Sequence, residues 1–118
     1  MVGRDGDNIL LDKSFSFAIR IVNLYKFLCK KKKEFVLAKQ ILRSGTSIGA
    51  NIEEANGAIS KSDFSSKISI AYKESRETNY WLKLLFETDY LNKKSFESLA
   101  VDCDEISRLT FSILKTTG

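Results

Sequence analysis

The 118-residue chain contains no proline, and its apolar residues recur along most of its length in steps of three and four. Proline is the strongest breaker of a helix interior, and this spacing gathers apolar side chains on one helix face. The chain is also long enough to enclose one core without a metal or a disulfide. The sequence therefore predicts an all-α domain over residues 12–118, preceded by a flexible leader over residues 1–11.

Capping and turn residues divide this domain into four predicted helices. The first runs from Asp12–Ser14 to about Lys31, the second over residues 34–56, the third over residues 61–88, and the fourth from residues 93–95 to Leu114. Short connections and the lack of strand-like alternation predict an antiparallel up-down-up-down four-helix bundle.

Apolar stripes identify the expected core face of each helix. In the first helix the stripe is widened by Ile19, Ile21, Leu24 and Leu28, so we expect it to contact more than one neighbour. The stripe itself consists of Phe15, Ala18, Val22, Tyr25 and Cys29. The stripes of the later helices consist of Ala38, Ile41, Gly45, Ile48, Ile52 and Ala55, then Phe64, Ile68, Ala71, Tyr72, Ser75, Leu82, Leu85 and Phe86, and finally Phe96, Leu99, Cys103, Ile106, Thr110 and Ile113.

Glycines mark two further features of the second helix. Gly45 and Gly49 are four residues apart and lie on one face, where each costs about 1 kcal/mol of helix propensity relative to alanine. Close approach of a neighbour would compensate for this cost, and a glycine-assisted bend is the alternative. Gly57 is expected to end the helix in the left-handed conformation, and Ser60 is expected to cap the next helix.

The composition excludes several classes of activity. The chain has no histidine, which rules out Glu-x-x-His di-iron sites and nucleophiles activated by histidine. Neither a phosphate-binding loop nor a dinucleotide fingerprint occurs, and Cys29 and Cys103 match no zinc spacing. We interpret both cysteines as core thiols of a reducing cytoplasm. No apolar run is long enough to span a bilayer, so we expect no membrane partner. Because the motifs named above are missing, we also expect no metal, no cofactor and no catalysis.

Charge is distributed unevenly along the chain. Residues 13–43 hold nine Lys or Arg and one Glu, a net +8, whereas residues 87–105 hold two Lys and six acids, a net −4. Such a basic hairpin could bind nucleic acid by releasing phosphate counterions, and the competing interpretation is a solvated hairpin tip without a ligand. The candidate nucleic-acid-binding residues are Lys30, Lys31, Lys32, Lys33, Lys39 and Arg43.

Polar and aromatic residues in the second and third helices form another candidate group. Carboxylates at Glu53, Glu54, Glu74 and Glu77 could be read as a metal site, but Arg43 is available as an ion-pair partner and favours a helix interface instead. Tyr80 and Trp81 suit core or subunit packing, with base stacking as the alternative. The candidates for helix packing or a subunit interface are Gly45, Gly49, Asn51, Glu74, Glu77, Tyr80 and Trp81.

Two blocks of sequence resemble the 23S rRNA intervening-sequence family of small bacterial four-helix bundles. The first is Leu42–Ala55, which reads LRSGTSIGANIEEA, and the second lies within Ser60–Leu82. The resemblance covers about Phe15–Leu114 and implies an antiparallel bundle that assembles as a homopentamer. Coding of the family within rRNA intervening sequences suggests a connection with RNA. Similar bundles also resemble the accessory proteins of diversity-generating retroelements, which work with a reverse transcriptase and structured RNA. It carries over no catalytic residue.

These observations together favour a non-enzymatic, self-assembling bundle. We expect it to act as a nucleic-acid-binding accessory or scaffold protein, with structured RNA or DNA as its partner. A protein–protein adaptor without nucleic-acid affinity is the alternative. A small carboxylate-based enzyme that uses Glu74 and Glu77 ranks last.

Overall fold

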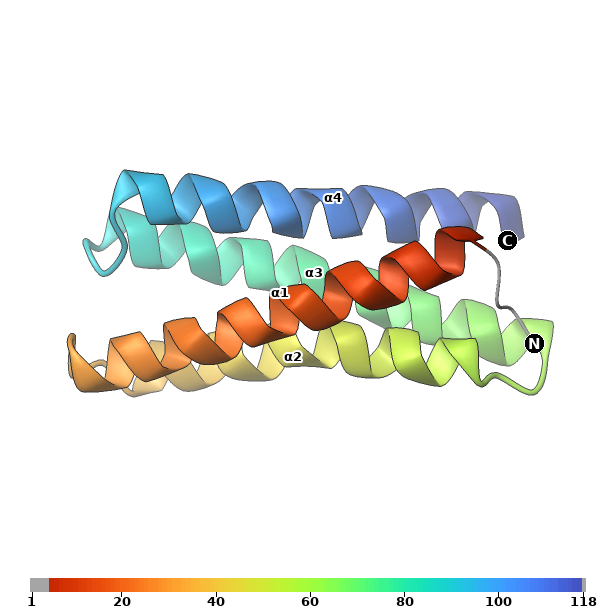
Figure 1. The fold of residues 1–118 in the computed structure, drawn as a ribbon, viewed down its shortest axis with the longest axis horizontal. Coiled ribbons are helices and arrows are strands. Elements are labelled where there is room, and N and C mark those ends of the chain that lie inside the picture. Colours follow the sequence, from red (N-terminus) through yellow and green to blue (C-terminus); the bar gives the residue numbers. More distant parts are fainter. Residues whose placement is uncertain (1–4, 118) are drawn as a thin grey trace.

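The computed structural model describes residues 5–117, and the side chains of residues 9–117. Four helices make up almost all of this part: α1 (Asp5–Lys30), α2 (Val36–Asn56), α3 (Lys61–Glu87) and α4 (Lys93–Thr117). They pack into a bundle that measures 43 × 19 × 19 Å (Figure 1). The expected all-α fold is confirmed, and the course of the ribbon is compatible with the up-down-up-down order. No described helix is long and apolar enough to cross a membrane.

Helix α1 begins earlier than expected. It starts at Asp5 rather than at Asp12–Ser14, so residues 5–11 of the expected leader are helical. Residues 1–4 of that leader lie outside the described residues. Helix α1 starts early because the side chain of Leu10 is fully buried, beside a small cavity that Ile52 and Phe64 also line. Full burial of one leucine contributes about 1.5–3 kcal/mol, which favours extending the helix toward the N-terminus.

The expected core face of α1 is confirmed only in part. Ile21, Leu24 and Leu28, which widened the predicted stripe, are buried. The stripe itself is wrong, because Phe15 is 68% exposed and Cys29 is only half-buried. The other buried residues of α1 are Leu10, Ser14 and Phe17. Because α1 is apolar on more than one side, periodicity alone did not select the face that turns inward.

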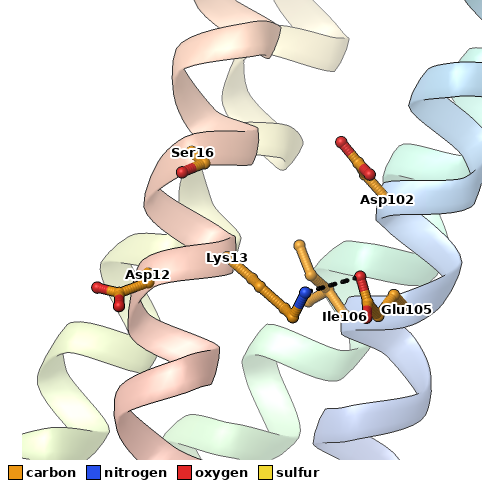
Figure 2. Close-up of a pocket in the computed structure, with 6 residues that line it drawn as sticks. All are labelled: Asp12, Lys13, Ser16, Asp102, Glu105 and Ile106. Atoms are coloured by element: carbon orange, nitrogen blue, oxygen red, sulfur yellow. Dashed lines mark ion pairs between the residues drawn. The ribbon is translucent and has the colours of Figure 1, made fainter.

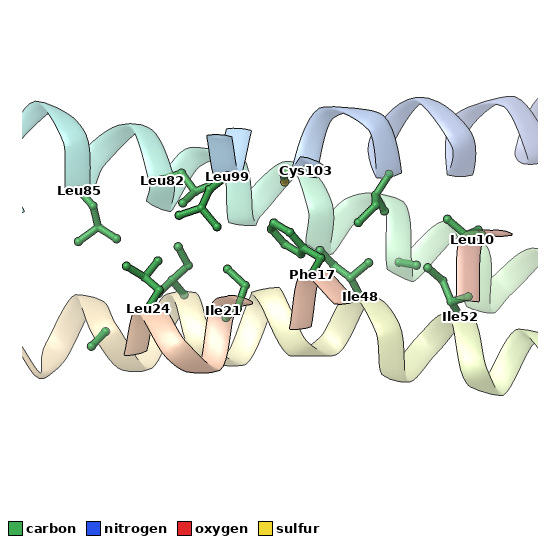
Figure 3. Packing of buried hydrophobic residues seen from close by; sticks show 14 of the residues in the cluster. Leu10, Phe17, Ile21, Leu24, Ile48, Ile52, Leu82, Leu85, Leu99 and Cys103 are labelled. Atoms are coloured by element: carbon green, nitrogen blue, oxygen red, sulfur yellow. The ribbon is translucent and has the colours of Figure 1, made fainter. Parts of the chain in front are cut away.

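The stripes of the other helices form the core largely as expected. Every predicted position of the α2 stripe is buried. In α3 and α4 most predicted positions are buried, whereas Tyr72, Phe86, Phe96 and Ile113 are half-buried. Figure 3 shows labelled core residues from all four helices facing one another. Cys103 lies among them, and burial raises the pKa of its thiol to about 12.

The turns differ from expectation in where the left-handed residues lie. Gly57 has φ −101°, so the expected left-handed end of α2 is wrong, and the positive φ values belong to Lys33 (55°) and Asp89 (70°). At Asp89 this conformation lets Tyr90 N–H donate to Leu85 O at 2.9 Å, which satisfies a carbonyl at the end of α3. Ser60 caps α3 as expected, accepting from the Asp63 N–H at 3.0 Å.

Glycines allow α1 to lie directly against α2. A Cβ atom at Gly45 would come within 2.8 Å of two side-chain carbons of Ile21, which is itself fully buried. A Cβ atom at Gly49 would lie 3.3 Å from the backbone carbonyl oxygen of Ser14. The cost of both glycines in helix propensity is therefore compensated by close packing within one chain.

This geometry predicts the effect of filling the contact. Gly45→Ala should lower the free energy of unfolding by about 1–3 kcal/mol, because overpacking against Ile21 outweighs the gain in helix propensity. Gly57→Ala is the matched control: its Cβ would meet nothing closer than 3.9 Å, so the variant should be neutral or more stable. Urea melts measure both effects. Equal stabilisation by the two substitutions would contradict close α1–α2 packing.

Candidate nucleic-acid interface

Ion pairs to α4 neutralise two cations of the basic hairpin. The Lys13 ammonium lies 3.1 Å from Glu105, and the Arg20 guanidinium lies 2.6 Å from Asp102. Figure 2 shows Lys13 reaching across to Glu105 beside a hollow of about 280 Å³, which Asp12 and Asp102 also line. This hollow holds more acids than bases, so it does not suit a phosphate.

Arg43 lies in the α2–α3 interface rather than with the lysines. Its guanidinium donates to Glu74 at 3.3 Å and to Glu77, and the hydrogen bond with Glu77 is the main cause of its raised pKa. The Trp81 indole N–H also donates to Glu77 at 2.9 Å. The pKa of the Glu77 carboxyl is lowered mainly by this hydrogen bond from Trp81, and to a smaller extent by the hydrogen bond from Arg43. Arg43 is thus held by two acids, which reduces its value as a phosphate ligand.

The other candidates for helix packing or a subunit interface make fewer polar contacts than Arg43 and Glu77. The Asn51 amide donates to the carbonyl of Ser47 in its own helix at 2.9 Å. Tyr80 is 58% exposed, and its ring meets Trp81 edge-on with centroids 5.0 Å apart. Glu54 pairs with Lys67 at 2.9 Å. Within the described residues no three acids or cysteines are grouped in a way that could hold a metal ion.

The other predicted phosphate ligands gather at one end of the bundle. Lys30, Lys31, Lys32, Lys33 and Lys39 are all exposed, in or beside the α1–α2 connection. The α3–α4 connection lies at the same end (Figure 1) and is followed by the exposed Lys93 and Lys94.

We call residues 26–39 and 83–97 the basic end. It holds nine lysines against four acids, a net +5. In the described part of the chain, none of these lysines has a carboxylate within 4.0 Å. The opposite end, taken as residues 9–16, 50–67 and 104–117, is nearly balanced, with five cations and six acids.

Exposed aromatic rings accompany these lysines. Phe27 is 40% exposed and Phe35 is 52% exposed, and the Lys32 ammonium lies 5.9 Å from the Phe27 ring centre. Phe35 is the N-cap residue of α2, where it makes no side-chain cap. The Glu34 carboxylate instead accepts from the Ala38 N–H at 3.0 Å, which satisfies one donor at the start of α2.

Sequence reasoning missed six residues of this end: Lys26, Lys83, Lys93, Lys94, Phe27 and Phe35. Lys93 and Lys94 were counted within an acidic segment, which concealed their position. The predicted topology contained the missing signal, because the first and third connections of an up-down-up-down bundle lie at the same end.

Comparison with known proteins identifies the family. A family model described as 23S rRNA-intervening sequence protein matches residues 6–112. The chain belongs to this family. It is also similar to a solved protein of unknown function from the S23 ribosomal protein family of Bacteroides thetaiotaomicron, with 57% identity and a TM-score of 0.92. That match covers 93% of this chain and 98% of the other. No curated protein matches the chain.

The Arg43–Glu77 contact of this family member predicts how its stability depends on pH. The folded-state pKa of Glu77 is lowered, so its contribution to stability is present above the unfolded-state value of about 4.3 and is lost as the pH falls through the folded-state value. Because the pair is partly exposed, Glu77→Gln should cost less than about 1 kcal/mol at neutral pH.

Urea melts at a series of pH values test this expectation. The difference in unfolding free energy between wild type and Glu77→Gln should shrink toward zero in acid. Glu53→Gln is the control, because Glu53 is exposed and lacks a cation within 4.0 Å among the described residues. A Glu77→Gln deficit that stays constant down to about pH 3 would refute the electrostatic explanation.

Proposed function

We propose that this protein is a non-enzymatic accessory or scaffold protein that binds RNA phosphates at its basic end. The observation that carries the proposal is the gathering of nine lysines against four acids, in the α1–α2 connection and in the adjoining ends of all four helices. The family description, which refers to an rRNA-intervening sequence, favours RNA over DNA. The cytoplasm suits this role, because RNA is available there and the unpaired thiols of Cys29 and Cys103 stay reduced.

The chemistry of this end suits binding with little sequence preference. Lysine ammonium groups act as point charges on flexible stems, which attract phosphates without a fixed geometry. Affinity then comes mainly from the release of counterions and falls as salt rises.

The backbone at Lys33 supports a role for its charge. A lysine at φ 55° is strained, and glycine would adopt this conformation at lower cost. Strain of this kind tends to persist where a side chain is needed for function. Keeping a lysine at this position despite the strain is compatible with a role for its charge in phosphate binding.

A second surface favours self-assembly. Phe15 is 68% exposed and Ile19 is 50% exposed, four residues apart on one face of α1. Phe15 also lines a groove of about 320 Å³ between α1 and α2. Exposed apolar ridges beside grooves mark protein contacts, so we propose a homo-oligomer built through α1. The family resemblance favours five subunits.

Two other functions rank below this one. An adaptor without nucleic-acid affinity is the alternative, and the Phe15–Ile19 ridge on its own would support it. A carboxylate enzyme ranks last, because Glu74 and Glu77 are both engaged by Arg43.

Salt titration tests the proposed RNA binding. Wild type should bind structured RNA with a steep logarithmic salt dependence and little sequence preference. Lys31→Glu combined with Lys32→Glu should weaken binding and reduce the slope by about 0.7–0.9 for each phosphate that the variant no longer neutralises. The fold should be unaffected, because both side chains are exposed in a turn. Unchanged binding by the variant, or no binding by wild type at low salt, would favour the adaptor.

A matched pair of turn variants separates charge from strain in the same assay. Lys33→Gly and Asp89→Gly both relieve a left-handed residue at the basic end, and each should stabilise the fold by up to about 1 kcal/mol. Lys33→Gly removes a positive charge and should weaken RNA binding, whereas Asp89→Gly removes a negative charge and should not. Equal effects of the two variants on RNA binding would argue against a contribution of the Lys33 charge to that binding.

Light scattering after gel filtration tests the assembly. Wild type should elute as a closed oligomer, with five times the 13.4 kDa chain mass as the favoured value. Phe15→Ser with Ile19→Ser should release monomers, because it removes the apolar ridge. Ile59→Ser is the control, since Ile59 is 95% exposed in the α2–α3 connection and away from the ridge. A wild type that is monomeric at micromolar concentration would overturn the proposal.

A further inference from the structure

The groove between α1 and α4 widens into a hollow at the basic end. Its volume is about 370 Å³, within the range of about 300–1,000 Å³ that is typical of small-molecule sites. Helix α1 contributes Asn23, Leu24 and Phe27, and the α3–α4 connection with the start of α4 contributes Leu91, Asn92 and Ser95. The hollow therefore lies between the C-terminal half of α1 and the start of α4, close in sequence to Lys30 on one side and to Lys93 and Lys94 on the other.

The lining combines an apolar floor with hydrogen-bonding groups. Leu24 and Leu91 are buried, whereas the Phe27 ring is 40% exposed and offers a flat apolar face. The Asn23 side chain is exposed and lines the hollow. The Asn92 side-chain oxygen accepts from the Ser95 N–H at 2.8 Å, which leaves its NH₂ group as a donor. A flat ring beside amide groups is the surface that a nucleobase requires.

Lysines flank this lining on two sides. Lys30–Lys33 follow α1 on one side, and Lys93 and Lys94 start α4 on the other. The Arg20 guanidinium, held by Asp102 at 2.6 Å and by the Ser98 hydroxyl at 2.9 Å, also lines the hollow. A ligand that complements this arrangement has a flat uncharged ring with an anionic group on each side.

We propose that the hollow receives one unpaired base of an RNA strand, stacked on Phe27, while the flanking phosphates lie on the lysines that follow Phe27 and on those that start α4. This inference rests on the proposed function and adds that the preferred ligand is single-stranded. A duplex keeps its bases stacked and paired, so it can offer a base to the hollow only at the cost of opening.

Fluorescence anisotropy with three probes of equal length tests the inference. The probes are a labelled 12-residue oligouridine, a 12-base-pair RNA duplex, and an oligouridine whose four central residues are abasic. Wild type should bind the first most tightly. Phe27→Ala should weaken oligouridine binding about 5- to 150-fold, as expected when one stacking ring is removed, and should leave its salt slope unchanged.

Phe111→Ala is the matched control. Phe111 is 48% exposed and has a lysine ammonium, that of Lys115, 5.8 Å from its ring centre, but it lies near the C-terminal end of α4, at the opposite end of the bundle. This variant should bind all three probes like wild type. Phe27→Leu serves as a second variant, which keeps the apolar volume and should still abolish the stacking. Thermal melts check that each variant folds.

The outcomes separate the two proposals. Equal affinity of wild type for the intact, abasic and duplex probes, or equal effects of Phe27→Ala and Phe111→Ala, would overturn the base site but leave phosphate binding standing. No binding of any probe at low salt would overturn both. Binding to phosphatidylserine vesicles that requires Phe27, without RNA binding, would identify the end as a membrane contact and would likewise overturn both.

Discussion

The contact between Ile21 and Gly45 determines how α1 sits on the rest of the bundle. Because Gly45 and Gly49 have no Cβ atoms, α1 lies directly on α2. Figure 1 shows α1 crossing the bundle obliquely, with its C-terminal half beside α2 and away from α4. The α1–α4 side is consequently spanned by ion pairs and contains two hollows, of about 280 and 370 Å³. Close packing of α1 on the glycines of α2 thus leaves open space toward α4, in addition to the groove of about 320 Å³ beside Phe15.

The ion pairs across this groove also shape the charge of the molecule. Exposed pairs such as Lys13–Glu105 and Arg20–Asp102 contribute little to stability, typically about 0–1 kcal/mol each. Their larger effect is on where net charge remains, because they neutralise cations along the length of α1 and not at its end. The excess lysines are left at the connections, so the basic hairpin of the sequence becomes a basic end in the structure.

The sequence predicted the parts of this fold that depend on local pattern. The α2 stripe was regular, and Ser60 stood before an apolar run, so both could be predicted. The inward face of α1 could not, because Phe15 and Phe17 lie on different sides of a helix that is apolar on both, and only contact with Gly45 decides between them. Glycine preference pointed to Gly57, whereas the turns themselves require left-handed backbone at Lys33 and Asp89.

The candidate site also combines features that local pattern predicts with features that depend on helix packing. Lys30–Lys33 could be predicted as exposed, since a run of cations closes a helix and forms the turn that follows. The engagement of Arg43 by Glu74 and Glu77 depends on how α2 and α3 are aligned, which no local pattern specifies.

The proposed surfaces for assembly and for RNA lie apart on α1, because Ile19 and Lys30 are separated by about 16 Å of helix. An oligomer formed through the Phe15–Ile19 ridge would therefore leave each basic end accessible. Several weak phosphate and base contacts on one strand would then combine into tight binding, because each additional contact becomes intramolecular.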